Sequence, residues 1–192
     1  MCTRKRLAEV AKAAAQKPFY GILQNKEANI QPIVELFPKW NIRQADKNWC
    51  AAFVYYCCVE VGFKIPYSPN ECVSCSLAGC GGWEDFAIND ERMEYHLGSD
   101  NIFIPEAGDI ILYDRVFINT EHDHIGIILE NMSDSIMVAE GNTFNDNISR
   151  VLTRNKDEHV RAYIRIPNNF DYYNSSSDEL LVNFENIIGE KL

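Results

Sequence analysis

The sequence lacks an excess of basic residues, and it lacks any long apolar run. Its 18 Lys and Arg residues stand against 28 Asp and Glu residues, so the formal net charge is −10. Proteins that neutralise nucleic-acid phosphates need clustered Lys and Arg, which argues against nucleic acid as a partner. No run approaches the roughly 18 apolar residues of a membrane span, so we predict that the chain does not span a membrane.

The cysteines do not form a set typical of a disulfide framework. They number seven, which is odd, and Cys57 and Cys58 are adjacent, which suits free thiols in a reducing compartment. The first residues imitate a secretory signal, but Glu9 and Lys12 interrupt the apolar stretch. We therefore expect synthesis in the cytoplasm without a signal peptide. Action on a cell wall would then follow release, injection or lysis.

The apolar pattern changes along the chain from helical to strand-like. Capping residues, breakers and apolar spacing predict four helical segments at 3–16, 27–36, 49–62 and 72–86. Pro32 interrupts the second of these, and Gly62 is placed to end the third. Five short β-rich runs follow at 109–113, 124–130, 135–140, 148–153 and 160–166.

This order of elements indicates an α+β fold, with the strands forming an antiparallel meander. One domain is expected over residues 1–168. Residues 169–192 are expected to be a polar linker and a C-terminal amphipathic helix, because Ser176 and Glu179 form a capping-box pattern before an apolar stripe.

Cys50 is the strongest candidate for a reactive thiol. It falls in the first turn of the predicted buried helix, where unpaired N–H groups and the helix dipole favour a thiolate. Cys57 and Cys58 lie two turns further along, where a free cysteine usually behaves as a small buried hydrophobe. The sequence therefore predicts Cys50 as a nucleophile.

A cysteine nucleophile needs a base, and the chain has four histidines. His124 opens the apolar run HIGIILE, so it is expected at the rim of a strand. His122 would point to the same face if the strand included it, and it is the competing candidate. His96 and His159 lie in charged stretches and are expected to be exposed.

The imidazole in turn needs a polar group that fixes its tautomer and stabilises its charged form. Glu140 and Asn142 close the segment SIMVAEGN, and they would face the same way if the strand continued through Gly141. A hairpin with its turn near Asp134 would bring these two side chains to His124.

Four motifs occur in a set order along the chain: NWCAAFV from Asn48, AGDII from Ala107, DHIGI from Asp123 and EGNT from Glu140. Their order and spacing resemble the CHAP domain (cysteine, histidine-dependent amidohydrolase/peptidase), a relative of the NlpC/P60 peptidoglycan hydrolases. The resemblance implies a papain-like α+β fold in which N-terminal helices, with the catalytic cysteine at a helix N-terminus, pack on an antiparallel sheet. It makes residues 1–168 a catalytic domain.

The resemblance also implies a role for each matching residue. Cys50 would be the nucleophile, His124 the base and later the acid, Glu140 the group that orients the imidazole, and Asn142 a secondary polar support. The implied reaction is cleavage of a peptidoglycan amide, between sugar and stem peptide or within the stem or cross-bridge. Gln44, six residues before Cys50, could donate to the oxyanion as a glutamine does in papain-like enzymes.

We predict no cofactor and no metal ion. Some members of the family carry an acidic calcium loop before the cysteine, whereas the corresponding QADKN here offers only Asp46. The spacing of Cys72 and Cys75, with Cys80 beyond them, permits a zinc interpretation. A structural zinc site needs a fourth ligand, which is not apparent in the sequence.

Three functions remain open from the sequence. The first is a cysteine amidase or endopeptidase that acts on peptidoglycan. The second is an intracellular or injected cysteine peptidase or acyltransferase that acts on a protein or small amide, favoured by the acidic charge and the missing wall-binding module. The third is a non-catalytic binding module of the same fold. The expected partners are a peptidoglycan or peptide substrate and a protein for delivery or inhibition.

Overall fold

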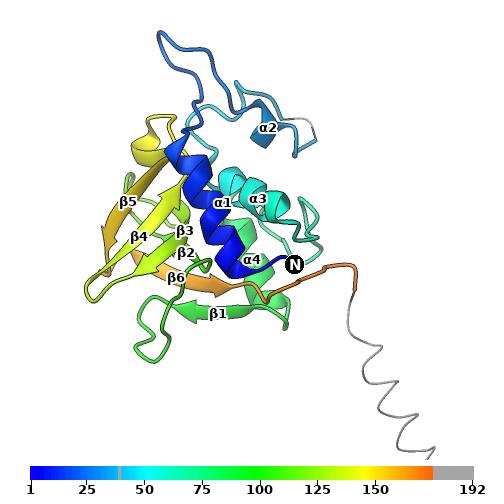
Figure 1. Cartoon of the computed structure of the whole chain (residues 1–192), viewed down its shortest axis with the longest axis vertical. Helices are drawn as coiled ribbons and strands as arrows, with labels where there is room; N and C mark the ends of the chain where they lie inside the picture. The colour runs from blue at the N-terminus through cyan, green and yellow to red at the C-terminus, as the bar shows by residue number, and fades with distance from the viewer. Residues whose placement is uncertain (39, 175–192) are drawn as a thin grey trace, which may run out of the picture.

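The computed structural model describes residues 1–38 and 40–174, and in it α1 and α3 pack against a six-stranded sheet (Figure 1). The elements in chain order are α1 (Arg4–Gln16), α2 (Gln31–Val34), α3 (Cys50–Val61), α4 (Cys80–Asn89), β1 (Glu94–Leu97), β2 (Ile110–Tyr113), β3 (His124–Asn131), β4 (Ser135–Glu140), the 3₁₀ turn η1 (Thr143–Asn145), β5 (Arg150–Asn155) and β6 (Val160–Arg165). The predicted C-terminal helix lies outside the described residues.

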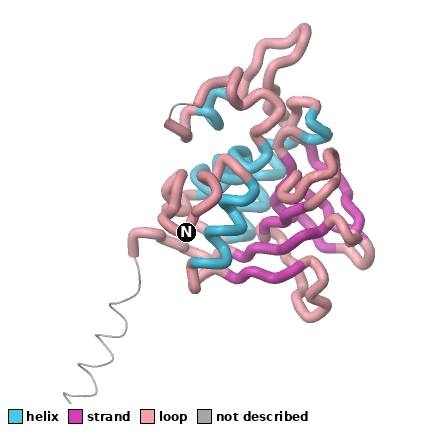
Figure 2. The backbone as a smooth tube through the Cα atoms, turned by 180° about the vertical axis from the view of Figure 1, so that it is seen from behind, coloured by secondary structure: helices cyan, strands magenta, loops and turns pink. Residues whose placement is uncertain are grey.

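The sheet is antiparallel throughout, in the order β1-β6-β2-β3-β4-β5, and Figure 2 shows its strands from behind. Strands β2 to β5 form the predicted meander. The prediction was wrong for β6, which returns across the sheet to pair with β2 instead of following β5. It also missed β1, an edge strand with no buried residue, because its four residues are too few for their alternation to stand out from a loop.

Two helices match their sequence signals. Thr3 caps α1 by accepting a hydrogen bond from the backbone N–H of Arg6, at 3.2 Å. Helix α3 begins at Cys50 and ends where Gly62 adopts a left-handed conformation, with φ of 96°. Eight of the residues of α3 are buried, as expected of a helix that is apolar on most sides. Cys50 is therefore held on a rigid, buried element.

The other two helices differ from prediction. Helix α2 is a single turn in which Pro32 stands near the start, where proline is tolerated, instead of interrupting a longer helix. Helix α4 starts at Cys80, later than expected, after an irregular segment. Gly82 packs so closely on that segment that a Cβ would lie 2.4 Å from the backbone oxygen of Ser76. The absence of a side chain at Gly82 allows this close approach.

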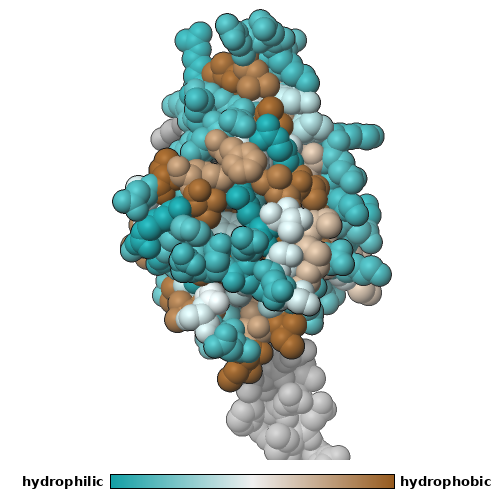
Figure 3. Space-filling model, turned by 90° about the vertical axis from the view of Figure 1, so that its left-hand side faces the viewer, coloured by the Kyte–Doolittle hydropathy of each residue, from teal (hydrophilic) through white to brown (hydrophobic). Residues whose placement is uncertain are grey.

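The sheet buries both of its faces. The main core lies between the helices and one face, and it includes Trp49, Phe53 and Ile125. The other face carries a second cluster of buried side chains: Ile111, Tyr113, Ile128, Ile136, Val138, Val160 and Tyr163. On the side seen in Figure 3, hydrophilic residues predominate and the hydrophobic ones form separate patches. In the described part of the chain, no helix is long and apolar enough to cross a membrane.

Candidate active site

Three separate elements bring Cys50, His124 and Glu140 together. Cys50 is the first residue of α3, His124 is the first residue of β3, and Glu140 is the last residue of β4. Because β3 and β4 are antiparallel neighbours, the start of one and the end of the other meet at the same end of the sheet. The Nε2 atom of His124 lies 2.9 Å from Oε2 of Glu140. All three residues are buried.

The surroundings of Cys50 favour its thiolate. A hydrogen bond with Cys80 is the largest influence, and it lowers the pKa of Cys50 well below the ordinary value. Burial acts in the opposite direction, but hydrogen bonding to His124, the charge of that imidazole and the backbone N–H of Ala51 lower the pKa of Cys50 further. The thiolate is the nucleophilic form of cysteine, so these contacts make Cys50 more nucleophilic at neutral pH.

His124 is held in its charged form. Burial by itself would lower its pKa, but the charge of Glu140 and hydrogen bonds to Cys50 and Glu140 outweigh burial and raise the pKa of His124 to about 9. Cys50 and His124 therefore form a thiolate–imidazolium pair at neutral pH. In such a pair the sulfur can attack while the imidazolium already carries the proton that a leaving amine needs.

Glu140 is paired on its other side with Arg154 of β5, a residue that the sequence analysis did not single out. The guanidinium donates from Nε to Oε1 at 2.8 Å and from its terminal nitrogen to Oε2 at 2.6 Å. Burial raises the pKa of Glu140, but the charges and hydrogen bonds of His124 and Arg154 outweigh it and lower the pKa. Arg154 thus keeps a fully buried carboxylate ionised beside the imidazole.

Gly126 makes room for this arrangement. A Cβ at this position would lie 2.9 Å from Cγ of Glu140 and 2.4 Å from a methyl carbon of Val138. Any side chain there would displace the Glu140 carboxylate from His124. The glycine in the HIGI run is therefore a signal for the site, although the sequence analysis treated it only as part of a strand.

Aromatic side chains enclose the imidazole. The ring of Phe117 meets that of His124 edge-on, with centroids 4.7 Å apart, and the Tyr113 ring lies 6.3 Å away at an interplanar angle of 25°. Phe144 packs on Phe117 at 5.4 Å and is half exposed. The guanidinium of Arg154 lies 5.0 Å from the centre of the Phe117 ring. These rings limit the access of water to the paired charges.

His122 occupies a different place from the one expected. It lies in a turn before β3 with φ of 53°, so the expectation that it shares a strand face with His124 was wrong. Its Nε2 atom pairs with the Glu84 carboxylate of α4, which Arg161 also binds. The histidine that adjoins the Cys50 thiol is His124, and His122 belongs to a separate cluster.

Asn142 is buried but is turned toward its own loop. Strand β4 ends at Glu140, and Asn142 adopts a left-handed conformation with φ of 50°, so the strand does not continue through Gly141 as expected. The Asn142 side chain donates to Oδ1 of Asn145 at 3.1 Å and accepts from the backbone N–H of Asn147 at 3.1 Å. It organises the loop that follows Glu140, and its supporting role in catalysis stays a prediction.

Asn147 links that loop to the segment before the nucleophile. Its Oδ1 atom accepts hydrogen bonds from the backbone N–H of Lys47 at 2.7 Å and from the indole of Trp49 at 3.2 Å. Its amide group donates to Asp46 at 2.6 Å and to the backbone oxygen of Ile22 at 3.0 Å. A lone asparagine in a polar stretch carries no sequence signal for this task, which depends on contacts about 100 residues apart in the chain.

Gln44 lies on a turn six residues before Cys50, and it is exposed. Its backbone N–H donates to Oδ1 of Asn41 at 3.1 Å, which holds the turn. Within the described residues, no hydrogen bond joins the Gln44 side chain to Cys50 or His124, so its role at the oxyanion stays a prediction.

The three cysteines that permitted a zinc interpretation have separate neighbours. The thiol of Cys72 donates to the backbone oxygen of Gly82 at 3.2 Å, and Cys75 is exposed. The sulfur of Cys80 instead lies 3.9 Å from the sulfur of Cys50. Among the described residues there is no cluster of three or more His, Cys, Asp or Glu side chains suited to a metal ion.

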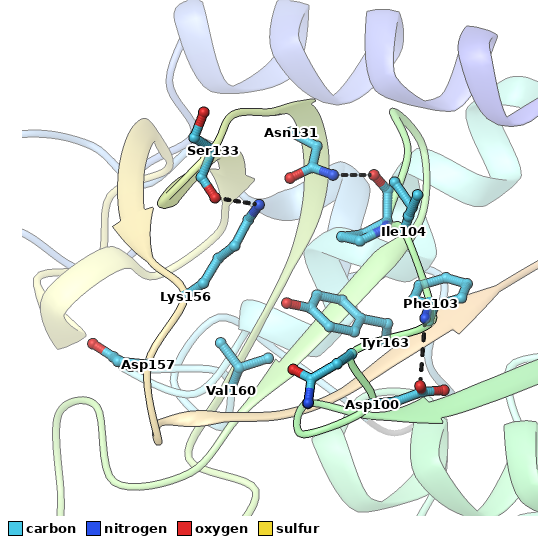
Figure 4. Close-up of a pocket in the computed structure, with 12 residues that line it drawn as sticks. Asp100, Phe103, Ile104, Asn131, Ser133, Lys156, Asp157, Val160 and Tyr163 are labelled. Carbon is cyan, nitrogen blue, oxygen red and sulfur yellow. Dashed lines mark hydrogen bonds between the residues drawn. The ribbon is translucent and has the colours of Figure 1, made fainter.

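A cavity of about 430 Å³ lies elsewhere, over the second face of the sheet (Figure 4). Tyr163 and Val160 of β6 form part of its lining, together with Asn131 at the end of β3 and Lys156 just after β5. The Nζ atom of Lys156 donates to backbone oxygens of the β3–β4 turn. Since Cys50 packs in the core on the helical face, this cavity is not the space in front of the nucleophile.

This chain is similar to a known family and to a solved structure. The family model of the CHAP domain matches residues 42–142, from the turn before Cys50 to Asn142. Among solved structures, one described as "The crystal structure of Ly7917" is 13% identical, with a TM-score of 0.48. The match covers 85% of this chain and 61% of that one, so this chain spans about three fifths of its length. No curated protein matches. The family model covers just over half of the 192 residues of this chain, so the chain belongs to the CHAP domain family.

Proposed function

We propose that this protein is a cysteine hydrolase that cleaves an amide bond of bacterial peptidoglycan through an acyl-enzyme on Cys50. The family is one of amidases and peptidases, and peptidoglycan is the substrate class associated with it. The observation that carries the proposal is the buried alignment of Cys50, His124 and Glu140, with opposite charges favoured on the first two.

The reaction proceeds in two halves. The Cys50 thiolate attacks the carbonyl carbon, and the backbone N–H at Cys50 helps to hold the oxyanion that forms. The His124 imidazolium gives its proton to the leaving amine, which departs and leaves a thioester on Cys50. Neutral His124 then removes a proton from water, the hydroxide attacks the thioester, and the acid product leaves as the thiolate–imidazolium pair is restored. Glu140 keeps the imidazole oriented in both halves.

Muropeptide analysis tests the reaction and identifies the bond. Purified peptidoglycan is incubated with the wild-type protein, and the soluble products are identified by mass spectrometry. An amidase separates the sugar from the stem peptide, whereas an endopeptidase exposes a new amine within the stem or cross-bridge. Cys50→Ala should abolish product release, because it removes the thiolate that forms the thioester, and the neighbouring thiol of Cys80 stays protonated. Cys2→Ala, which removes a thiol that lies before α1 and contacts Asn169, is the matched control and should keep wild-type activity.

Two outcomes would replace this proposal. If Cys50→Ala retained full activity, the nucleophile would lie elsewhere. If muropeptides stayed unchanged while Cys50 reacted rapidly with iodoacetamide, the protein would be a cysteine peptidase or acyltransferase that acts on a protein or small amide. An unreactive Cys50 with an ordinary thiol pKa near 8.5 would instead support a non-catalytic binding module.

A further inference from the structure

A second thiol faces the nucleophile. Cys80 is the first residue of α4, as Cys50 is the first residue of α3, so the starts of two helices bring the two sulfurs to 3.9 Å. Both residues are buried, each with 7% of its surface exposed. At this separation one thiol can donate a hydrogen bond to the other sulfur.

The environment assigns different protonation states to the two sulfurs. Cys50 lies beside the His124 imidazolium, whose charge and hydrogen bond favour a thiolate. The hydrogen bond with Cys50 raises the pKa of Cys80, and so do burial and the negative charges of Cys50 and Asp123. The proton of the pair therefore stays on Cys80, and the negative charge stays on Cys50.

We propose that Cys80 is a second catalytic thiol, whose S–H group donates a hydrogen bond to the Cys50 thiolate and keeps that sulfur charged before attack. The inference rests on the proposed role of Cys50 as nucleophile. Cys80 adds a hydrogen-bond donor to the Cys50 sulfur, in addition to the helix dipole and the imidazole.

The proposal has a pH signature that a purely structural residue lacks. A hydrogen bond to a charged group stabilises that charged form, so Cys80 raises the thiolate fraction of Cys50 most where the pH is low. At high pH the thiolate forms without this help. Loss of the donor should therefore slow the reactions of Cys50 at acidic pH and leave them nearly unchanged at alkaline pH.

The test measures the alkylation rate of Cys50 by iodoacetamide across this pH range in the full-length protein. Labelling is located by mass spectrometry on the tryptic peptide 48–64, which carries Cys50, and each rate is compared with peptidoglycan release at the same pH. Cys80→Ala should react about tenfold more slowly than wild type near pH 6 and within about twofold of it near pH 9. Cys80→Ser, whose hydroxyl is also a donor, should stay close to wild type.

Equal pH profiles for wild type and Cys80→Ala would overturn the role of Cys80 while leaving Cys50 as nucleophile. A Cys80→Ser profile like that of Cys80→Ala would also overturn it, because a restored donor would then have no effect. A wild-type Cys50 that reacts like an ordinary thiol would defeat the proposed function itself. Should Cys80→Ala fail to fold, Cys80→Val fills the volume without a donor and gives the same comparison.

Discussion

Two clusters in this protein share the same three residue types. In one, Glu140 pairs with His124 and Arg154, and in the other, Glu84 pairs with His122 and Arg161. Each carboxylate accepts two hydrogen bonds from its arginine.

The clusters differ in burial and in what lies beyond the histidine. The side chain of His124 is 1% exposed and faces the thiol of Cys50, whereas that of His122 is 30% exposed. Glu84 also accepts a hydrogen bond from the hydroxyl of Tyr95, at 2.5 Å, and Arg161 continues to Asp114 at 3.0 Å.

The second cluster therefore joins α4 to β1, to β6 and to the loop that leads into β3. A His–Glu–Arg group is therefore not by itself a catalytic feature. Such a group acquires that role only where a nucleophile lies within reach of the imidazole and water is excluded.

Replacing the two histidines should separate the clusters most clearly. His124→Ala removes the proton donor and acceptor of both half-reactions, so we expect about a 10³-fold loss of kcat or more. His122→Ala should keep activity within about threefold, because it touches neither sulfur nor substrate. The rate of muropeptide release at a fixed peptidoglycan concentration measures the activity of both variants. Equal losses in the two variants would contradict the division of roles.

Replacing the two glutamates should give opposite balances of activity and stability. Glu140→Gln keeps the shape but removes the charge that holds His124 protonated, so we expect about a 10²-fold loss of kcat. Glu84→Gln should cost about 1–3 kcal/mol of unfolding free energy with a much smaller loss of activity. Chemical denaturation and muropeptide release together make the measurement. If Glu84→Gln lowered activity as much as Glu140→Gln, the second cluster would have to act in catalysis.

The two clusters should also respond at opposite ends of the pH scale. The raised pKa of His124, about 9, means that kcat/KM falls as pH rises through 9 and the imidazolium loses its proton.

The pKa of Glu84 is affected in the other direction. Burial raises it, but Arg161, Tyr95 and His122 outweigh burial and lower it to about 2. The stability from this group is present above its ordinary value of 4.5 and is lost as pH falls through about 2. Activity and thermal unfolding profiles would test both limbs. An alkaline limb near pH 6.5 would show that Glu140 does not sustain the His124 charge.

The loop after Glu140 gives the smallest expected effect. Asn142→Ala loses two hydrogen bonds and puts alanine in a left-handed conformation, so we expect about 1–2 kcal/mol of destabilisation and a loss of kcat below about tenfold. Asn142→Gly removes the same hydrogen bonds without the backbone penalty and should be intermediate in stability. Thermal unfolding and kinetics distinguish the two. A loss as large as that of Glu140→Gln would mean that Asn142 acts directly on the imidazole.

The sequence predicted those parts of the site that depend on local structure. The start of α3 at Cys50 follows from an apolar run that ends at Gly62, and the start of β3 at His124 follows from HIGIILE. Arg154 could not be predicted in this way, because it reaches Glu140 from a neighbouring strand. Asn147 was missed for a similar reason, since its partners are Trp49 and Asp46, far away in the chain.

By itself, the sequence determined the α+β order, the helix that carries Cys50 and the two strand ends that supply His124 and Glu140. These features depend on periodicity, capping and breakers, which act over a few neighbouring residues. Only the tertiary structure decided that His124 and not His122 adjoins the thiol, and that Cys80 faces Cys50. Both outcomes depend on how the turn before β3 and the start of α4 pack against distant elements, and local propensities do not encode such packing.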